Sequence, residues 1–331
     1  MERKEFIRAI AGGGALLATS RLPVFGEDNP FVFPRRGAYE RLQLGYAVVK
    51  AGATTPFSML HISDTHLTAA YGSESTNRQR LARHRTVTFG GRQEEALRDS
   101  IAWARENADF ILHTGDLVDF QSEANYDLAR AAFFKPGKDG APDRPGVNVF
   151  AVGNHEYSPE MWLGAEKCTF DEAWRAKCAP SAAAGLERDD LSFGATVVNG
   201  VNFVAMDDVY GTVSADQAAR FKAEAAKGLP IVLCMHVPFF TESIWIAHEV
   251  FWRRRGKTFA SSAFPANGDL KRQQDDAVTQ GFIAYLKGEP LLKAILAGHL
   301  HIDVQDRFSP TAMEYVVGGN FMFHGQHVLF T

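Results

Sequence analysis

The stretch Phe-Ser-Met-Leu-His-Ile-Ser-Asp-Thr-His at residues 57–66 joins a short apolar run to a polar cluster. The apolar run, residues 57–62, has the length and the aromatic and branched content of a buried strand. The polar cluster contains Asp64 and His66. Further apolar runs of strand length lie at residues 110–112, 147–152, 201–206, 231–235 and 291–297.

Stretches with helical character separate most of these runs. We expect helices at residues 93–106, 123–134, 214–227 and 273–286, and Ser214 is suited to cap the third of them. Strands and helices in alternation predict an α/β architecture, in which ligands bind at the carboxyl ends of the strands.

Two long segments interrupt the alternation. Residues 68–92 follow the first run, and residues 239–272 follow the fifth. Connections of this length in a compact domain are commonly lids or binding loops. We therefore expect both segments to be lid-like insertions.

The composition excludes several classes of protein. The chain has 331 residues, of which 46% are hydrophobic and 22% charged, and its formal net charge is −4. This balance argues against a disordered chain and against a strongly basic nucleic-acid binder, so we expect no stable nucleic-acid binding. A chain of this length buries a large core, and a metal would serve function rather than folding.

The N-terminus resembles an export signal. Arg3 and Lys4 precede twelve uncharged residues, Ala9 to Ser20, in a pattern similar to the twin-arginine motif. We expect residues 1–26 to be a signal peptide recognised by export machinery, and the mature protein to be periplasmic or secreted. An ordinary amphipathic helix is the alternative.

The predicted organisation after the signal is a lead segment, residues 27–50, followed by one domain, residues 51–331. No later segment has the roughly 18 consecutive apolar residues of a membrane helix, so we expect no membrane span. Cys168 and Cys178 could pair in an oxidising compartment, whereas Cys234 lies in an apolar run and is expected in the core.

Polar clusters follow five of the apolar runs. They offer two aspartates, four histidines and an asparagine as ligands for divalent cations, which is enough for two ions. Each cluster alone is a weak signal, but five clusters at strand ends in one chain indicate a metal site. The clusters lie at residues 63–66, 115–119, 153–156, 235–238 and 298–301.

The order of these clusters is similar to that of the calcineurin-like metallophosphoesterase family. Asp-x-His, Gly-Asp-x-x-Asp, Gly-Asn-His-Glu, a single His and Gly-His-x-His follow one another between residues 57 and 301. The resemblance implies a four-layer α/β/β/α sandwich of two mixed sheets, with a two-metal site at the strand-end loops.

The resemblance also implies a set of metal ligands. The first metal would be held by Asp64, His66 and His301, and the second by Asn154, His236 and His299. Asp116 would bridge the two ions, which offsets their mutual repulsion, and a bridging hydroxide would be the nucleophile. Because sites rich in histidine disfavour Mg and Ca, two divalent or trivalent ions of Mn, Fe or Zn are expected.

Two further residues carry implied catalytic roles. His155 matches the family's histidine that contacts the substrate and does not bind metal. Asp119 matches the aspartate that pairs with this histidine and would fix its tautomer. A structural carboxylate that caps the turn after Asp116 is the alternative for Asp119.

The chain departs from two branches of the family. Phe120 and Gln121 follow Asp119, and Val152 precedes Gly153, so two phosphate-binding arginines of the protein Ser/Thr phosphatase branch are missing. Asp119 also occupies the position of the metal-binding tyrosine in the purple acid phosphatase branch, which argues against a tyrosinate-ferric site.

Any arginine that binds phosphate must then come from an insertion, since the guanidinium fork matches phosphate oxygens. Arg78 and Arg85 in the first insertion and Arg253 in the second are candidates. Trp252 could contact a nucleobase, sugar or acyl chain. The alternatives are solvated arginines and an aromatic lid core.

Together these features predict an exported, binuclear metal-dependent phosphoesterase that acts on small-molecule phosphate esters. A phosphodiesterase or nucleotide pyrophosphatase at the same site is one alternative. A metal-binding pseudoenzyme that serves as a binding module is the alternative from another class.

Overall fold

The computed structural model describes residues 39–134, 147–160, 169, 171–255 and 267–331. The predicted signal peptide, Cys168 and part of each of the segments 27–50 and 239–272 lie outside the described residues. All described residues belong to one unit, residues 33–331.

The first sheet has five strands in the order β1, β11, β2, β3, β4. Strands β2, β3 and β4 are parallel, β11 is antiparallel to β2, and β1 is parallel to β11, so the sheet is mixed. The strands are β1 Gln43–Val49, β2 Phe57–Ile62, β3 Phe110–His113, β4 Val147–Phe150 and β11 His324–Phe330.

The second sheet has six strands in the order β5, β6, β7, β8, β10, β9. Its four central strands are parallel, and β5 and β9 form antiparallel edges. The strands are β5 Phe193–Val198, β6 Val201–Met206, β7 Ile231–Cys234, β8 Leu292–Ala297, β9 Val304–Arg307 and β10 Met313–Val316.

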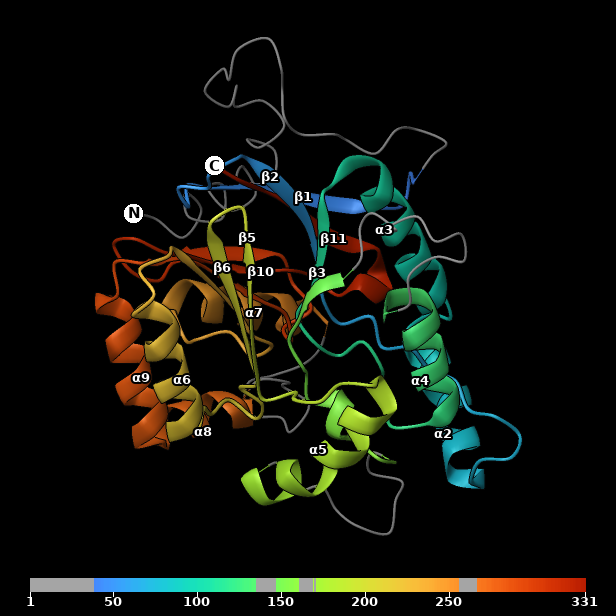
Figure 1. The fold of residues 1–331 in the computed structure, drawn as a ribbon. Helices are drawn as coiled ribbons and strands as arrows, with labels where there is room; N and C mark the ends of the chain where they lie inside the picture. The colour runs from blue at the N-terminus through green and yellow to red at the C-terminus, as the bar shows by residue number, and fades with distance from the viewer. Residues whose placement is uncertain (1–38, 135–146, 161–168, 170, 256–266) are drawn as a thin grey trace. The chain divides into compact units, whose positions relative to one another are not determined.

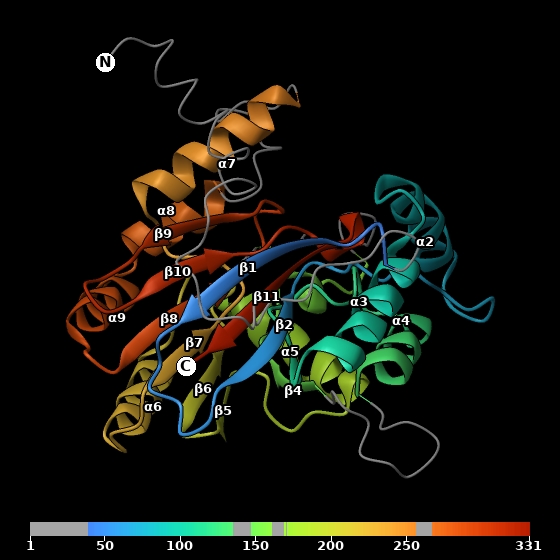
Figure 2. The same cartoon turned by 90° about the horizontal axis from the view of Figure 1, so that it is seen from above.

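The two sheets pack face to face and helices cover their outer faces (Figures 1 and 2). Met59 of β2 and Val232 of β7 share the core between the sheets. The neighbouring residue Leu60 points to the other face of β2, where it belongs to a core shared with helices α3 (Gln93–Asn107) and α5 (Glu172–Leu186). Because both faces of the sheets are buried, the strands read as continuous apolar runs. The predicted four-layer sandwich is confirmed.

The helices of the first half are α2 Thr76–Thr88, α3 Gln93–Asn107, α4 Glu123–Ala129 and α5 Glu172–Leu186. A π-helical turn, Arg130–Phe134, continues α4. The helices of the second half are α6 Ala215–Ala225, α7 Glu242–Arg254, α8 Asn267–Asp275 and α9 Ala277–Gly288. Short 3₁₀ turns lie at His155–Tyr157 and Asn320–Met322.

Several local predictions are confirmed. All six apolar runs form strands, and Ser214 caps α6 in a capping box with Gln217. The prediction of a single helix at residues 273–286 was wrong in its extent. Helix α8 ends at Asp275, and the Asp276 side chain caps α9 by accepting the N–H of Thr279.

The two insertions contain helices. Residues 68–92 hold α2, and residues 239–272 hold α7 and most of α8. Strand β1 lies in the predicted lead segment and pairs with β11, so the sheet begins before residue 51. Cys234 is buried in β7 as expected, and Cys178 is buried in α5. Within the described residues, no helix is long and apolar enough to cross a membrane.

Candidate metal centre

The polar clusters lie where the two sheets present the carboxyl ends of their strands. Asp64 and His66 follow β2, Asp116 follows β3, and Asn154 follows β4 in the first sheet. In the second sheet His236 follows β7, and His299 and His301 follow β8. Because these strands are parallel within each sheet, their ends lie along a common edge of the sandwich.

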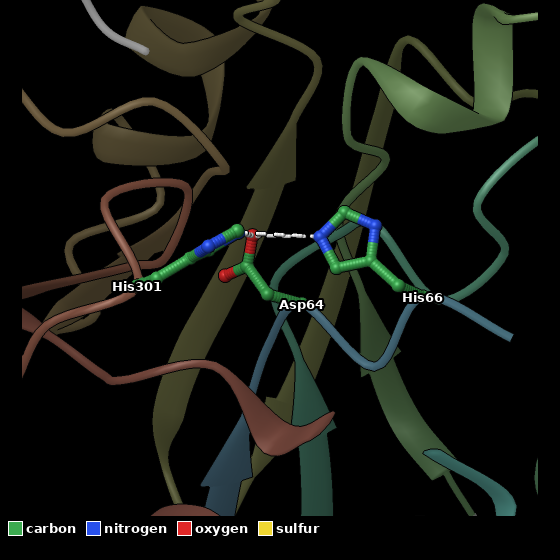
Figure 3. Close-up of side chains that lie close together, drawn as sticks. All are labelled: Asp64, His66 and His301. Carbon is green, nitrogen blue, oxygen red and sulfur yellow. Dashed lines mark hydrogen bonds and ion pairs between the residues drawn. The ribbon is translucent and has the colours of Figure 1, made fainter. Parts of the chain in front are cut away.

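The first group of side chains contains Asp64, His66 and His301 (Figure 3). Oδ1 of Asp64 lies 3.1 Å from Nε2 of His301 and 3.8 Å from Nε2 of His66. The two Nε2 atoms are 3.2 Å apart. Three potential ligand atoms therefore face a common point.

The second group surrounds Nε2 of His236. This atom lies 3.2 Å from Oδ1 of Asn154 and 3.2 Å from Nδ1 of His299. Oδ2 of Asp116 lies 3.3 Å from it, and the same oxygen is 3.7 Å from Nε2 of His66 in the first group. Asp116 thus stands between the two groups, in the position that a bridging ligand requires.

The hydrogen bonds around the histidines leave lone pairs directed into the two groups. Nδ1 of His66 lies 3.0 Å from Oδ1 of Asp119, and Nδ1 of His236 lies 2.7 Å from the carbonyl oxygen of Thr114. Each of these acceptors needs an N–H, so the other ring nitrogen keeps its lone pair and can coordinate a metal ion. Separations of about 3 to 3.6 Å are those between ligands bonded at about 2.1 Å.

Asp64 gives a further indication of a metal. Its Oδ1 is buried and has no well-directed hydrogen bond in the described part of the chain, although Nε2 of His301 lies 3.1 Å away. A buried, unsatisfied carboxylate oxygen is costly unless a cation offsets its charge. The residues present therefore fit a pair of metal ions.

The backbone at the site is strained. Five of the proposed ligands have positive φ, namely Asp64 at 54°, His66 at 51°, Asp116 at 56°, His299 at 67° and His301 at 55°. Non-glycine residues adopt this region rarely, and such strain is concentrated at functional sites. The strained turns direct each side chain away from its strand and toward the shared centre.

Two motif glycines make the close approach of these turns possible. A Cβ on Gly153 would lie 2.3 Å from Oδ1 of Asp116, and a Cβ on Gly298 would lie 2.6 Å from Oδ2 of Asp64. Neither position tolerates a side chain, which explains why glycine precedes Asn154 and His299.

Two buried carboxylates hold the loops that carry the ligands. Glu156 accepts backbone N–H groups from residues 116, 117, 118 and 153, at 2.7–3.1 Å. Asp208 accepts the N–H groups of His236 and Val237 at 3.0 and 3.1 Å. Glu156 completes a motif seen in the sequence, whereas Asp208 has no such signal.

His155 lies beside the two groups, and its predicted contact with Asp119 is present. Its Nδ1 is 2.7 Å from the carbonyl oxygen and 3.1 Å from Oδ1 of Asp119, which leaves Nε2 to face Asp116 at 3.9 Å. Burial opposes the charged form of His155, but the Asp116 and Asp119 carboxylates outweigh it and raise its pKa to about 9.

The predicted substrate contacts fall at different places. Arg85 binds the Asp119 carboxylate, with Nε 2.6 Å from Oδ2. Arg78 lies near Glu74 and Glu160, and Arg253 binds Glu249 on the surface of α7. Trp252 faces His301, with 6.4 Å between the ring centroids. The substrate roles of these four residues stay predictions.

Asp269 is a further residue of the site that was missed in the sequence. Asp269 of α8 lies with Oδ2 3.0 Å from Nε2 of His299, and Arg272 binds its other oxygen. Asp269 stands outside the five clusters, in an insertion without a recognisable motif. Only the position of α8 brings it to the site.

The sandwich and its two groups of ligands define the class of metal-dependent phosphoester hydrolases. A family model described as calcineurin-like phosphoesterase matches residues 57–303. The chain belongs to this family, which implies a dinuclear metal centre. No protein of curated function matches the sequence.

The solved structures that match this chain share little sequence with it. A dimetal phosphatase from Danio rerio has 14% identity, with 80% of this chain and 88% of that chain covered and a TM-score of 0.45. A purple acid phosphatase from yellow lupin seeds has 13% identity, with 81% and 45% covered and a TM-score of 0.48. The chain thus spans less than half the length of the lupin protein.

Proposed function

We propose that the protein hydrolyses phosphate esters of small molecules at a centre of two metal ions. Asp64, His66 and His301 would hold the first ion, Asn154, His236 and His299 would hold the second, and Asp116 would be the ligand common to both. The observation that carries this proposal is the position of Asp116, whose Oδ2 lies 3.7 Å from His66 of one group and 3.3 Å from His236 of the other.

The metals, when bound, would neutralise phosphoryl charge and lower the pKa of a bound water molecule toward about 7. The chain supplies the remaining functions. His155 directs Nε2 toward the site, where an N–H would donate to a phosphoryl or leaving oxygen. Asp119 fixes the ring of His155 through Nδ1. The imidazole-rich ligand set favours Mn, Fe or Zn.

The test combines metal removal with turnover of a chromogenic ester. The purified protein is treated with chelator, assayed on p-nitrophenyl phosphate and bis-p-nitrophenyl phosphate, and titrated with Mn, Fe or Zn. We expect activity to vanish with the metal and to return as metal content approaches two ions per chain. Absence of turnover at full occupancy, with both substrates, would favour a pseudoenzyme that only binds its ligand.

A phosphodiesterase is the second candidate, and the state of Arg85 favours it. The Nε edge of this guanidinium is bonded to Asp119 and is not available to a phosphate dianion. A diester carries one negative charge fewer than a dianionic monoester and depends less on an arginine clamp. The ratio of kcat/KM for the diester and the monoester decides between the two candidates.

We further propose that residues 1–26 direct export, so that the enzyme acts in the periplasm or outside the cell. The support is the pattern of Arg3 and Lys4 followed by an uncharged run. Mass spectrometry of the protein from its native host should find a chain shortened by about 20 to 26 residues. An intact N-terminus in the cytoplasmic fraction would contradict export.

A further inference from the structure

Arg85 of the first insertion reaches the site through its contact with Asp119. It stands in the last turn of α2, which begins after a Ser75 cap. Its Nε lies 2.6 Å from Oδ2 of Asp119 and its Nη2 2.7 Å from Oδ1, so the guanidinium holds both carboxylate oxygens. The Asp119 side chain is fully buried, and the Arg85 side chain is 15% exposed.

The same carboxylate contacts two histidines that have different proposed tasks. Oδ1 of Asp119 lies 3.0 Å from Nδ1 of His66, a proposed metal ligand. It also lies 3.1 Å from Nδ1 of His155, which faces the substrate position. The carboxylate therefore orients the ring of His66 directly and adds a second contact to His155, whose Nδ1 also lies 2.7 Å from the main-chain carbonyl oxygen of Asp119.

The bidentate contact explains how this orientation is maintained. Two parallel N–H···O bonds restrict rotation of a carboxylate more than a single bond does. The ring of Phe89 supports the guanidinium, whose Cζ lies 4.6 Å from the ring centroid. Phe89 also stacks on His66, with 4.3 Å between the ring centroids. The end of α2 thus packs against the proposed ligand as well as against Asp119.

We propose that Arg85 is a positioning residue that fixes Asp119, so that His66 and His155 are held in the geometry required for metal binding and catalysis. This inference rests on the proposed function for the roles of His66 and His155. The first insertion then contributes to the metal centre, and Arg85 is not a phosphate clamp. Loss of Arg85 frees the Asp119 carboxylate, which loosens the ring of His66 and removes one of the two contacts that orient His155.

The experiment compares Arg85→Gln, Asp119→Asn and the double variant with wild type. Arg83→Gln is the matched control, because Arg83 is an exposed residue of the same helix. The first readout is Mn²⁺ binding to chelator-treated protein by calorimetry. The second is kcat and KM on bis-p-nitrophenyl phosphate at saturating Mn²⁺, together with inhibition by inorganic phosphate.

We expect Arg85→Gln to weaken the binding of one Mn²⁺ by about tenfold, the lower end of the range for outer partners of metal-binding histidines. The value of kcat should fall, whereas KM and the inhibition constant of phosphate should change less than about twofold. The double variant should resemble Asp119→Asn alone, since Arg85 acts only through Asp119. Arg83→Gln should resemble wild type.

Two results would overturn the proposal. One is Mn²⁺ binding by Arg85→Gln equal to that of wild type. The other is a large loss of phosphate affinity, or a double variant in which the separate losses caused by Arg85→Gln and Asp119→Asn simply combine. Either outcome would make Arg85 a direct substrate contact.

A conservative variant covers the case in which Arg85→Gln does not fold. Lysine keeps the charge but offers a single point of contact, so Arg85→Lys should bind Mn²⁺ with intermediate affinity. Affinity equal to wild type would contradict the need for two bonds. If the wild-type protein binds two Mn²⁺ but turns over no ester, the proposed function fails, while the metal-binding comparison still tests Arg85.

Discussion

Oδ2 of Asp269 lies 3.0 Å from Nε2 of His299, the ring nitrogen that does not face His236. Both side chains are buried, and Arg272 holds the other carboxylate oxygen of Asp269 at 2.7 Å. Since Nε2 is occupied, Nδ1 of His299 is the nitrogen that faces His236 and the proposed second metal. A carboxylate behind a ligand histidine fixes the ring and makes it a stronger ligand.

Replacing Asp269 should therefore weaken one metal. We expect Asp269→Asn to lower the affinity for one of two Mn²⁺ ions by about 10- to 100-fold, the range typical of such outer partners. Calorimetric titration of chelator-treated protein measures this loss. Asp275→Asn, at an exposed position of the same helix, is the control. Equal Mn²⁺ binding by the two variants would remove the assignment of Asp269.

Removal of the bridging carboxylate should have a larger effect. In Asp116→Asn the ligand common to both groups loses its charge, so metal content should fall below two ions per chain and turnover should collapse. The fold should survive on its large core. Metal analysis, turnover and a thermal melt measure the three outcomes, with the exposed Asp189→Asn as control. Full activity of Asp116→Asn would exclude the two-metal assignment.

The sequence predicted most of the site because the ligands are local to their strands. His236 directly follows an apolar run, and so do the Gly-His-x-His residues after β8. Parallel strands bring such ends together without further information. Asp208, Asp269 and the Arg85–Asp119 pair depend on the packing of loops and insertion helices, which no local pattern encodes.

Two of the five described strands that the sequence missed, β11 and β9, have a physical reason as well. β11 contains the buried polar residues Gln326 and His327, which interrupt its apolar pattern. β9, an edge strand, has only partly buried and exposed residues. Strands of this kind are defined by their partners rather than by their own composition. The left-handed backbone of the ligands is likewise absent from any sequence signal.

His327 of β11 should make stability depend on pH. Burial lowers its pKa to about 4, with a weak opposing effect of the Asp109 charge. Between pH 6.5 and 4 the unfolded chain takes up a proton that the folded chain does not, so this residue destabilises the fold as the pH falls through that window. The loss approaches about 1.4 kcal/mol per pH unit at most.

In His327→Gln this dependence is removed. The difference in unfolding free energy between wild type and His327→Gln should shift by about 1 to 3 kcal/mol in favour of the variant as the pH falls from 7 to 4.5. Denaturant melts at several pH values measure it. His84→Gln, an exposed histidine of α2, is the control. Parallel stability curves for wild type and His327→Gln would refute a neutral His327 in the fold.

The role of His155 can be separated from that of the metal ligands by the choice of leaving group. Asp119 occupies Nδ1, so Nε2 is the nitrogen that faces the site. If Nε2 donates a proton to the departing oxygen, loss of His155 should be most severe for alkyl esters, whose leaving groups need the proton. General acid catalysis of this kind contributes about 10²- to 10⁴-fold. With p-nitrophenolate, which leaves without a proton, the loss should be much smaller.

The measurement is kcat/KM for an alkyl phosphate ester and its p-nitrophenyl counterpart, in wild type and His155→Ala at matched metal occupancy. His236→Ala is the contrasting variant, because loss of a metal ligand should reduce kcat/KM for both substrates alike. Asp119→Asn should show part of the His155 pattern, since it acts on the imidazole, together with weaker metal binding through His66. An equal loss on both esters in His155→Ala would remove the acid role, and His155 would then stabilise the phosphoryl group by charge alone.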